Sequence, residues 1–319
     1  MLAFSGLREG QRVTVRARAK VNLGLEVLGR RADGYHELRS LLWAIDLADQ
    51  VTLEATAEGI VVQCGAPGVP EDADNLAWRA AELMRRQLGA DAGVRIEIDK
   101  VIPVAAGLGG GSADAAAVLV GLGPLWGVRL PRPRLQALAT ELGMDVPFFL
   151  REGPAVAFGR GERLRAVSAP PGVSLVLVNP GVPLATRDVY AALRPDDFTS
   201  GARVRALVAG LRDGAAGLAA RVFNGLEGAA LRLWPGLAEV RVALGRAGAL
   251  AAVMSGSGPT VIGIAPSRQA AFRIQEAVAR RGWRTWVTRT VAGPALSIRP
   301  GAPPPRVMGG DSSWGVAKR

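Results

Sequence analysis

The feature that most constrains this chain is a glycine-rich run, PVAAGLGGGSADAAA, at residues 103–117. Four glycines occupy the five positions from Gly107 to Gly111, and an alanine-rich stretch typical of a helix follows them. Glycine permits positive φ angles and close approach of a ligand, while a helix start offers unpaired N–H groups and a positive dipole end. The run therefore predicts a loop that holds phosphate.

This run matches neither of two common nucleotide-binding loops. No lysine follows the last glycine, as a Walker A loop requires, and Ser112 stands where a dinucleotide fingerprint has glycine. We therefore expect a third class of nucleotide loop, in which Ser112 caps the helix or faces a metal ion. The alternative is an ordinary glycine-rich turn between a strand, Val94 to Ile98, and a buried helix.

Length and composition favour a two-domain globular protein. The chain has 319 residues, of which 49% are hydrophobic and 21% charged. Its apolar stretches fall far short of the roughly 20 residues of a membrane helix, and its start lacks a secretory pattern. The single cysteine, Cys64, cannot form an internal disulfide. We expect a cytoplasmic protein, monomeric or homodimeric, with no membrane association.

The charge pattern points to a small anionic substrate. The net charge is +11, but the arginines are scattered and the chain has only two tyrosines and seven phenylalanines. We therefore expect no nucleic-acid partner. Only three of 39 basic residues are lysines: Lys20, Lys100 and Lys318. Because an ammonium is a compact charge that a guanidinium does not reproduce, Lys20 and Lys100 are candidate functional residues, with survival by chance as the alternative.

Hydrophobic periodicity predicts an α+β fold. The expected strands are Val13 to Val27, a strand pair within Gly34 to Leu53, Val94 to Ile98, Val173 to Val178, a hairpin from Ala251 to Ile264, and Arg284 to Thr290. The expected helices are Leu76 to Leu88 with Asp74 or Asn75 as its cap, Arg134 to Leu142 ended by Gly143, Arg187 to Leu193, Arg203 to Leu211, Val222 to Leu233 and Gln269 to Arg280. The run Pro170-Pro171-Gly172 predicts a boundary between domains 1–170 and 171–299, followed by a disordered tail, 300–319.

Five segments in a fixed order carry a resemblance to a known family. They are AKVNLGL (19–25), GRRADGYHEL (29–38), the glycine run preceded by Lys100, GMDVPFF (143–149) and MSGSGPT (254–260). Together they resemble the GHMP kinase superfamily over about residues 16–296. The segments GYHEL and DVPFF resemble the members that phosphorylate a cytidine diphosphate derivative of methylerythritol in the non-mevalonate route to isoprenoid precursors. This resemblance implies a domain like the second domain of ribosomal protein S5, a C-terminal ferredoxin-like domain, and an active site between them.

The resemblance implies transfer of the γ-phosphoryl group of ATP to a substrate hydroxyl, a reaction that depends on positioning and charge stabilisation. Lys20 and Asp145 would be catalytic, with Asp145 accepting the hydroxyl proton; a purely structural ion pair is the alternative. Asn22, on the same strand face as Lys20, would bind substrate together with Asp145. Ser112 is the candidate contact for Mg²⁺. The implied ATP contacts are Lys100, Pro103, Val104, Ala105, Ala106, Gly107, Leu108, Gly109, Gly110, Gly111, Ser112 and Ala113.

Recognition of the cytosine is assigned to three residues. Tyr35 and Tyr190, the only tyrosines of the chain, would sandwich the base, and His36 would hydrogen-bond its edge. A histidine with a structural role is the alternative for His36. The segment 255–258 would form a third loop near the substrate phosphates, or an ordinary hairpin turn.

One motif departs from the family pattern, since Asn224-Gly225-Leu226-Glu227 has glycine where the family has aspartate. Two rival functions stay open. Another GHMP kinase, acting on a mevalonate derivative, homoserine or a sugar, would share the loop and the fold. A basic nucleic-acid-binding protein with an S5-like fold would explain the charge but not the glycine run.

Overall fold

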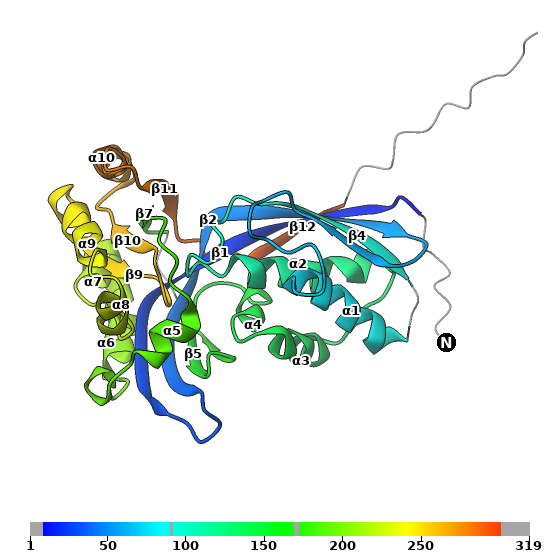
Figure 1. Cartoon of the computed structure of the whole chain (residues 1–319), viewed down its shortest axis with the longest axis horizontal. Helices are drawn as coiled ribbons and strands as arrows, with labels where there is room; N and C mark the ends of the chain where they lie inside the picture. The colour runs from blue at the N-terminus through cyan, green and yellow to red at the C-terminus, as the bar shows by residue number, and fades with distance from the viewer. Residues whose placement is uncertain (1–8, 90–91, 169–171, 301–319) are drawn as a thin grey trace, which may run out of the picture.

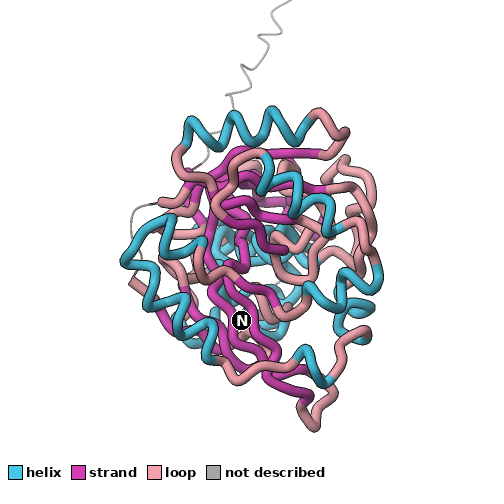
Figure 2. The backbone as a smooth tube through the Cα atoms, turned by 90° about the vertical axis from the view of Figure 1, so that its left-hand side faces the viewer, coloured by secondary structure: helices cyan, strands magenta, loops and turns pink. Residues whose placement is uncertain are grey.

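The computed structural model describes residues 9–89, 92–168 and 172–300, which form two lobes around two β-sheets (Figure 1). The larger sheet has eight strands in the order β12-β1-β2-β4-β3, with β5 and β6 joined through β2 and β8 joined through β1. The smaller sheet has four antiparallel strands in the order β11-β7-β10-β9. Strands run through the middle of the molecule and helices lie outside them (Figure 2). This arrangement confirms the predicted α+β class with two lobes.

The larger sheet is built on two very long strands. Its members are β1 (Arg12–Arg30), β2 (His36–Thr56), β3 (Ile60–Gln63), β4 (Gly93–Asp99), β5 (Ala155–Gly159), β6 (Arg163–Ala166), β8 (Phe223–Asn224) and β12 (Leu296–Pro300). The prediction of a strand pair within Gly34 to Leu53 is wrong, because β2 is one strand that pairs with β1 along its length. Residues 36–56 contain neither glycine nor proline, the two strongest signals of a turn, so the segment can continue as one strand.

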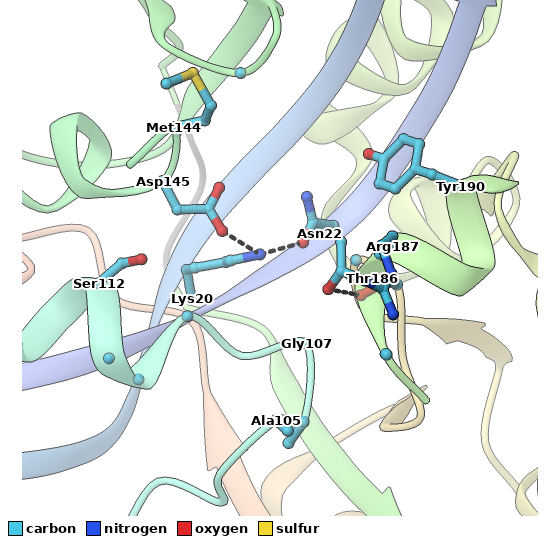
Figure 3. A pocket seen from close by; sticks show the side chains of 18 of the residues that line it. Lys20, Asn22, Ala105, Gly107, Ser112, Met144, Asp145, Thr186, Arg187 and Tyr190 are labelled. Carbon is cyan, nitrogen blue, oxygen red and sulfur yellow. Dashed lines mark hydrogen bonds and ion pairs between the residues drawn. The ribbon is translucent and has the colours of Figure 1, made fainter. Parts of the chain in front are cut away.

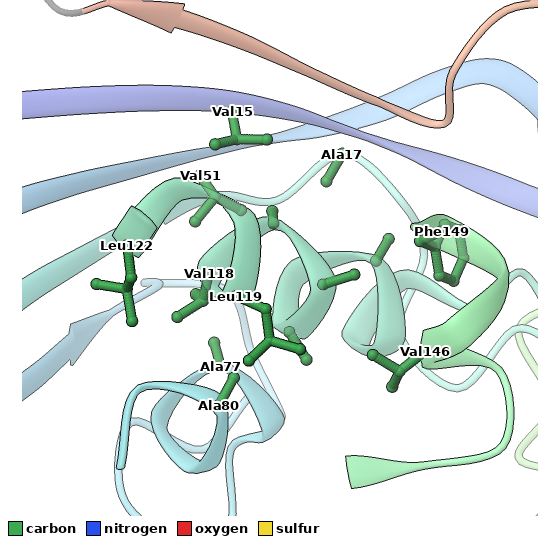
Figure 4. Close-up of a cluster of buried hydrophobic side chains, with 14 of the residues drawn as sticks. Val15, Ala17, Val51, Ala77, Ala80, Val118, Leu119, Leu122, Val146 and Phe149 are labelled. Carbon is green, nitrogen blue, oxygen red and sulfur yellow. The ribbon is translucent and has the colours of Figure 1, made fainter. Parts of the chain in front are cut away.

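Four helices cover one face of this sheet: α1 (Leu76–Leu88), α2 (Gly110–Leu125), α3 (Arg132–Leu142) and α4 (Val146–Phe149). The alanine-rich α2 is buried on nearly all sides, between the sheet and its neighbouring helices (Figure 4). Small side chains allow this close packing on both sides of one helix. The predicted cap of α1 is confirmed, because the side chain of Asn75 accepts a hydrogen bond from the backbone N–H of Ala77 at 2.9 Å.

The second lobe combines the smaller sheet with short helices. Its strands are β7 (Ser174–Asn179), β9 (Ala251–Met254), β10 (Val261–Ile264) and β11 (Arg284–Arg289). Its helices are α5 (Thr186–Ala191), α6 (Ala202–Gly210), α7 (Gly214–Ala219), α8 (Glu227–Leu233), α9 (Leu237–Arg246) and α10 (Arg268–Ala279), with 3-10 turns at Pro195–Asp197 and Leu211–Asp213. The predicted helix Val222 to Leu233 is wrong in its first part. There β8 pairs in parallel with β1, and Gly225, a poor helix former, precedes α8.

The chain returns to the larger sheet at its end. The strand β12 pairs with the first residues of β1, from Ala17 opposite Leu296 to Val13 opposite Pro300. Pro300, predicted to begin a disordered tail, is thus the last residue of a strand, and the rest of that tail lies outside the described residues. The predicted boundary at Pro170-Pro171 also lies outside them. No helix in the described ranges is long and apolar enough to cross a membrane.

Candidate active site

A cavity of about 1340 Å³ is lined by residues of both lobes. Its walls come from the β1–β2 hairpin, the glycine-rich loop with the start of α2, the start of α4, the α5 region and the loop after β9 (Figure 3). The predicted residues that line it are Lys20, Asn22, Tyr35, His36, Lys100, Pro103, Val104, Ala105, Ala106, Gly107, Gly109, Gly110, Gly111, Ser112, Asp145 and Tyr190. Segments far apart in the sequence therefore meet here.

Two predicted ATP contacts do not line the cavity. The side chains of Leu108 and Ala113 are fully buried in the core. The backbone carbonyl of Leu108 accepts a hydrogen bond of 2.9 Å from the N–H of Lys20, which ties the loop to β1. The predicted contacts of Leu108 and Ala113 with a nucleotide therefore have no support from the cavity lining.

The centre of the cavity holds a short chain of polar side chains. The ammonium of Lys20 lies 3.1 Å from a carboxylate oxygen of Asp145 and donates a hydrogen bond of 2.7 Å to the side-chain oxygen of Asn22 (Figure 3). Asn22 in turn donates to the hydroxyl of Ser40 at 2.8 Å. Lys20 and Asn22 are both buried on β1, with irregular pairing on either side of them. Such bulges re-aim side chains within a strand.

Asp145 reaches this group from a different element. It precedes the short helix α4, whose residues Val146 and Phe149 pack in the core beside α2 (Figure 4). Its side chain remains 36% exposed on the cavity side. A carboxylate that is open to a ligand and held beside an ammonium is suited to accept a proton from a bound hydroxyl.

The glycine-rich loop leads directly into α2. Gly109 has a φ of 70° and occupies the N-cap position, and the helix begins at Gly110. Of the two alternatives for Ser112, the helix cap is therefore wrong. Ser112 lies in the first turn, with its hydroxyl directed to the side of the cavity where Asp145 lies (Figure 3). Because the first N–H groups of a helix have no partner within it, this end can bind anionic oxygens.

Lys100 lies beneath the loop, between two carboxylates. Its ammonium donates to Asp49 at 2.5 Å and to Asp114, on α2, at 2.6 Å. Burial raises the pKa of Asp114 to about 7, and the two carboxylates raise the pKa of Lys100 although burial opposes this. Asp49 also accepts hydrogen bonds from the backbone N–H groups of Val101 and Ile102. Lys100 thus holds the strand, the loop and the helix together, and its predicted contact with ATP stays a prediction.

The far end of the cavity is aromatic. His36 and Tyr190 lie with their ring centroids 5.2 Å apart, while Tyr35 is 53% exposed at the hairpin tip. Burial and the charge of Arg30 lower the pKa of His36, which favours the neutral ring. Burial also raises the pKa of Tyr190, so its hydroxyl stays protonated. A flat ligand that lies against these rings would have both a stacking surface and a hydrogen-bonding edge.

Several lining residues were not predicted. Arg160 lies with its guanidinium carbon 5.0 Å from the centre of the Tyr35 ring, and Thr186 shares a hydrogen bond of 2.8 Å with Ser257. Other unpredicted lining residues include Leu184, Arg187, Met144, Phe198 and the segment from Gly68 to Pro70. The sequence held one signal, the arginine between two glycines at Gly159-Arg160-Gly161, a pattern of an exposed turn.

The donors for a metal ion are few. Among the described residues, no group of three or more His, Cys, Asp or Glu side chains could hold a metal. The Ser112 hydroxyl and the Asp145 carboxylate are oxygen donors on neighbouring parts of the wall. This set fits an ion such as Mg²⁺, which keeps several waters and takes other ligands from phosphates.

Comparisons with known proteins identify relatives of the chain. The models of the GHMP kinases N terminal domain and the GHMP kinases C terminal domain match residues 75–153 and 206–284. The 4-diphosphocytidyl-2-C-methyl-D-erythritol kinase of Pelotomaculum thermopropionicum is 43% identical over 280 residues, covering 87% of this chain and 98% of that protein. The enzyme of the same name from Geobacter sulfurreducens is 42% identical over 282 residues, covering 88% of this chain and 100% of that protein.

Solved structures give the same result. A crystal structure of 4-(cytidine 5'-diphospho)-2C-methyl-D-erythritol kinase has a TM-score of 0.77 and 42% sequence identity, covering 87% of this chain and 98% of that one. Homoserine kinase from Cytophaga hutchinsonii has a TM-score of 0.74 at 23% identity, covering 94% of this chain and 100% of that one. The second likeness concerns the fold alone.

Proposed function

The chain belongs to the family of 4-diphosphocytidyl-2-C-methyl-D-erythritol kinases within the GHMP kinases, and from this we propose how its cavity works. The protein uses ATP to phosphorylate 4-diphosphocytidyl-2-C-methyl-D-erythritol at a hydroxyl of the methylerythritol part, in isoprenoid precursor synthesis. The observation that carries the proposal is the position of the Lys20–Asp145 pair, between the glycine-rich loop and the aromatic end of the cavity.

The glycine-rich loop and the start of α2 bind the ATP phosphates. A Cβ atom on Gly109 would lie 3.0 Å from the side chain of Lys20, so the backbone here runs directly over the catalytic lysine. Gly107 and Gly109 have positive φ angles, a backbone conformation that occurs in loops whose N–H groups bind anions. Phosphates held at this position lie next to Lys20, whose ammonium stabilises the negative charge that the transferred group carries.

The aromatic end binds the cytidine part of the substrate. Tyr35 and Tyr190 stack on the base, and His36, neutral near pH 7, hydrogen-bonds its edge. The methylerythritol part then extends toward Asn22 and Asp145 at the centre. Asp145 accepts the proton of the attacking hydroxyl, and Lys20 holds the carboxylate in place for that step.

Mg²⁺ is the proposed metal cofactor. The Ser112 hydroxyl and the Asp145 carboxylate would hold it, with the remaining ligands from ATP and water. When bound, it would neutralise charge on the phosphates. The cytoplasmic location, the absence of a nucleic-acid partner and a monomeric or homodimeric state stay predictions.

Formation of ADP by the purified protein tests the proposed function. We expect ADP to form from ATP with the cytidine diphosphate alcohol, and only at a background rate without it or with homoserine or mevalonate. Equal rates with homoserine or mevalonate would contradict the proposed substrate. The same assay without added Mg²⁺ and with a chelator tests the metal.

A further inference from the structure

The motif that departs from the family pattern, Asn224-Gly225-Leu226-Glu227, lies next to β1, the strand that carries Lys20 and Asn22. Asn224 pairs in parallel with Leu25 of β1, and the N–H of Gly225 donates a hydrogen bond of 2.8 Å to the carbonyl of Leu25. This pairing begins just beyond Asn22 on the same strand. The backbone of Asn224 is thereby fixed relative to the catalytic centre.

The side chain of Asn224 is buried and its hydrogen bonds are satisfied. Its amide nitrogen donates to the backbone carbonyls of Met254, at 2.8 Å, and Gly256, at 2.7 Å. Its oxygen accepts a hydrogen bond of 2.8 Å from the N–H of Leu226. Only an amide offers two donors on one nitrogen and an acceptor beside it in this plane. The first carbonyl belongs to the last residue of β9, and the second belongs to the turn that follows it.

Glu227 holds the same turn from its other side. One carboxylate oxygen accepts a hydrogen bond of 2.6 Å from the N–H of Met254, and the other lies 3.0 Å from the guanidinium of Arg241. Asn224 and Glu227 together therefore fix both the carbonyl and the N–H of Met254. Since Met254 is the last residue of β9, this clamp sets where the turn at residues 255–258 begins.

The turn in question touches the catalytic residues. The hydroxyl of Ser255 donates to the carbonyl of Gly107 at 3.0 Å and accepts a weaker bond, 3.3 Å, from the N–H of Asn22. A Cβ atom on Gly256 would lie 3.2 Å from the Asn22 side-chain oxygen and 3.5 Å from the Lys20 ammonium. The turn therefore packs directly against both parts of the centre, the glycine-rich loop and β1.

We propose that Asn224 is a positioning residue for phosphoryl transfer, which acts by holding the 255–258 turn against Lys20, Asn22 and Gly107. It touches neither ATP nor substrate, since it does not line the cavity. The expected effect on kcat rests on the proposed function. The contact of Asn224 with the turn does not, because it can be measured in the protein without substrate.

The test replaces Asn224 with aspartate, which has the same shape but no amide donors. The ionised carboxylate of this variant would face the two carbonyl oxygens of Met254 and Gly256, and the repulsion between them would raise its pKa. Once protonated, the carboxyl group has one O–H donor for one of these carbonyls. At about pH 8 we expect kcat to fall about a hundredfold, the cost of displacing reacting groups by about 1 Å, with KM for ATP changed less than about threefold. Toward about pH 6 the activity relative to wild type should recover, because the protonated carboxyl restores a hydrogen bond.

Hydrogen–deuterium exchange of a peptide that covers residues 254–260 gives a readout without substrate. At about pH 8, this peptide should exchange faster in Asn224→Asp than in wild type. At about pH 6, its exchange rate should approach the wild-type rate at the same pH. The matched control is Asn179→Asp: Asn179 is equally buried in the same lobe, but its amide nitrogen faces the hydroxyl of Thr260, which can turn to donate. We expect this control to retain most activity.

The outcomes separate the two proposals. Unchanged exchange of the turn in a folded Asn224→Asp protein would overturn the positioning role, whether or not wild type is active. Faster exchange with unchanged kcat would overturn it too. If the wild type is inactive but exchange is faster in the variant, the proposed function is contradicted, while the conclusion that Asn224 holds the turn still stands. If Asn224→Asp does not fold, Asn224→Ala is measured instead, with loss of kcat, faster exchange and no recovery at low pH expected.

Discussion

Lys20 has an environment in which few other side chains would fit. It is 4% exposed and contacts the glycine-rich loop, Asn22 and Asp145 at once. A chain that otherwise uses arginine almost everywhere retains lysine here, as it does at Lys100. In both cases a compact ammonium lies between two side-chain acceptors, Asn22 and Asp145 for Lys20 and two carboxylates for Lys100.

Lys20→Arg is expected to reduce turnover about a hundredfold, because the larger planar guanidinium would displace Asp145 or the attacking hydroxyl by about 1 Å. Steady-state kinetics measure this. The control is Arg16→Lys, which exchanges the same two residue types on the same strand as Lys20. Arg16 forms an exposed ion pair with Asp46 of β2, so this change should be nearly silent. If Lys20→Arg stays within a few-fold of wild type, Lys20 is a replaceable charge and the catalytic pair is wrongly assigned.

The sequence allowed different parts of the site to be predicted for different reasons. Lys20, Asp145 and the glycine run stand in motifs with a fixed order, so the resemblance located them. Arg160 stands in none of these motifs and reaches the cavity from the turn after β5, whereas Thr186, the first residue of α5, lies on the same short helix as the predicted Tyr190. The ion pairs of Lys100 could not be predicted from the sequence either. Asp49 lies 51 positions away from Lys100, and no sequence pattern links the two residues.

At the scale of elements, local patterns predicted the helices better than the strand pairing. The helix Leu76–Leu88 was predicted with its exact ends because its periodicity and its cap are local signals. By contrast β8 is two residues long and exists only through its pairing with β1, and β12 forms by pairing with the start of the chain. Such long-range pairing leaves no trace in a short window, and tertiary contacts override local propensity.

The glycine-rich loop yields a prediction that separates two glycines. Gly109→Val should abolish ATP binding, because its φ of 70° is unfavourable for a β-branched residue and its Cβ would press on Lys20. Gly111→Ala is the control, and we expect it to leave the stability of the protein without ligand unchanged. A Cβ atom on Gly111 would meet nothing closer than 3.9 Å. At Gly110, which has no positive φ, the obstacle to a side chain is contact with Lys100 and Ile102.

Isothermal titration with a non-hydrolysable ATP analogue measures the effect, and circular dichroism checks that each variant is folded. Wild-type affinity in folded Gly109→Val would show that the phosphates bind elsewhere. Reduced affinity in Gly111→Ala with unchanged stability would indicate that the nucleotide lies directly over this turn of α2.

At the scale of the whole molecule, β1 joins the two lobes. It carries Lys20 and Asn22, pairs with β8 from the second lobe and packs under α2 of the first. The long β1–β2 hairpin is seen in Figure 1. Because β1 ends at Arg30 and β2 begins at His36, Tyr35 and His36 lie at its turn. This strand pair sets the separation between the proposed phosphate-transfer centre and the aromatic end, and under the proposed function that separation suits a long substrate with a base at one end.

The product of a complete reaction tests this account most directly. After incubation with ATP and the cytidine diphosphate alcohol, phosphorus NMR and mass spectrometry of the purified product should show one added phosphate, as a new ester on the methylerythritol part, with the cytidine diphosphate linkage intact. Recovery of unchanged alcohol with free inorganic phosphate, or a phosphate attached to the cytidine part, would contradict the proposed arrangement of ATP, Asp145 and the aromatic end.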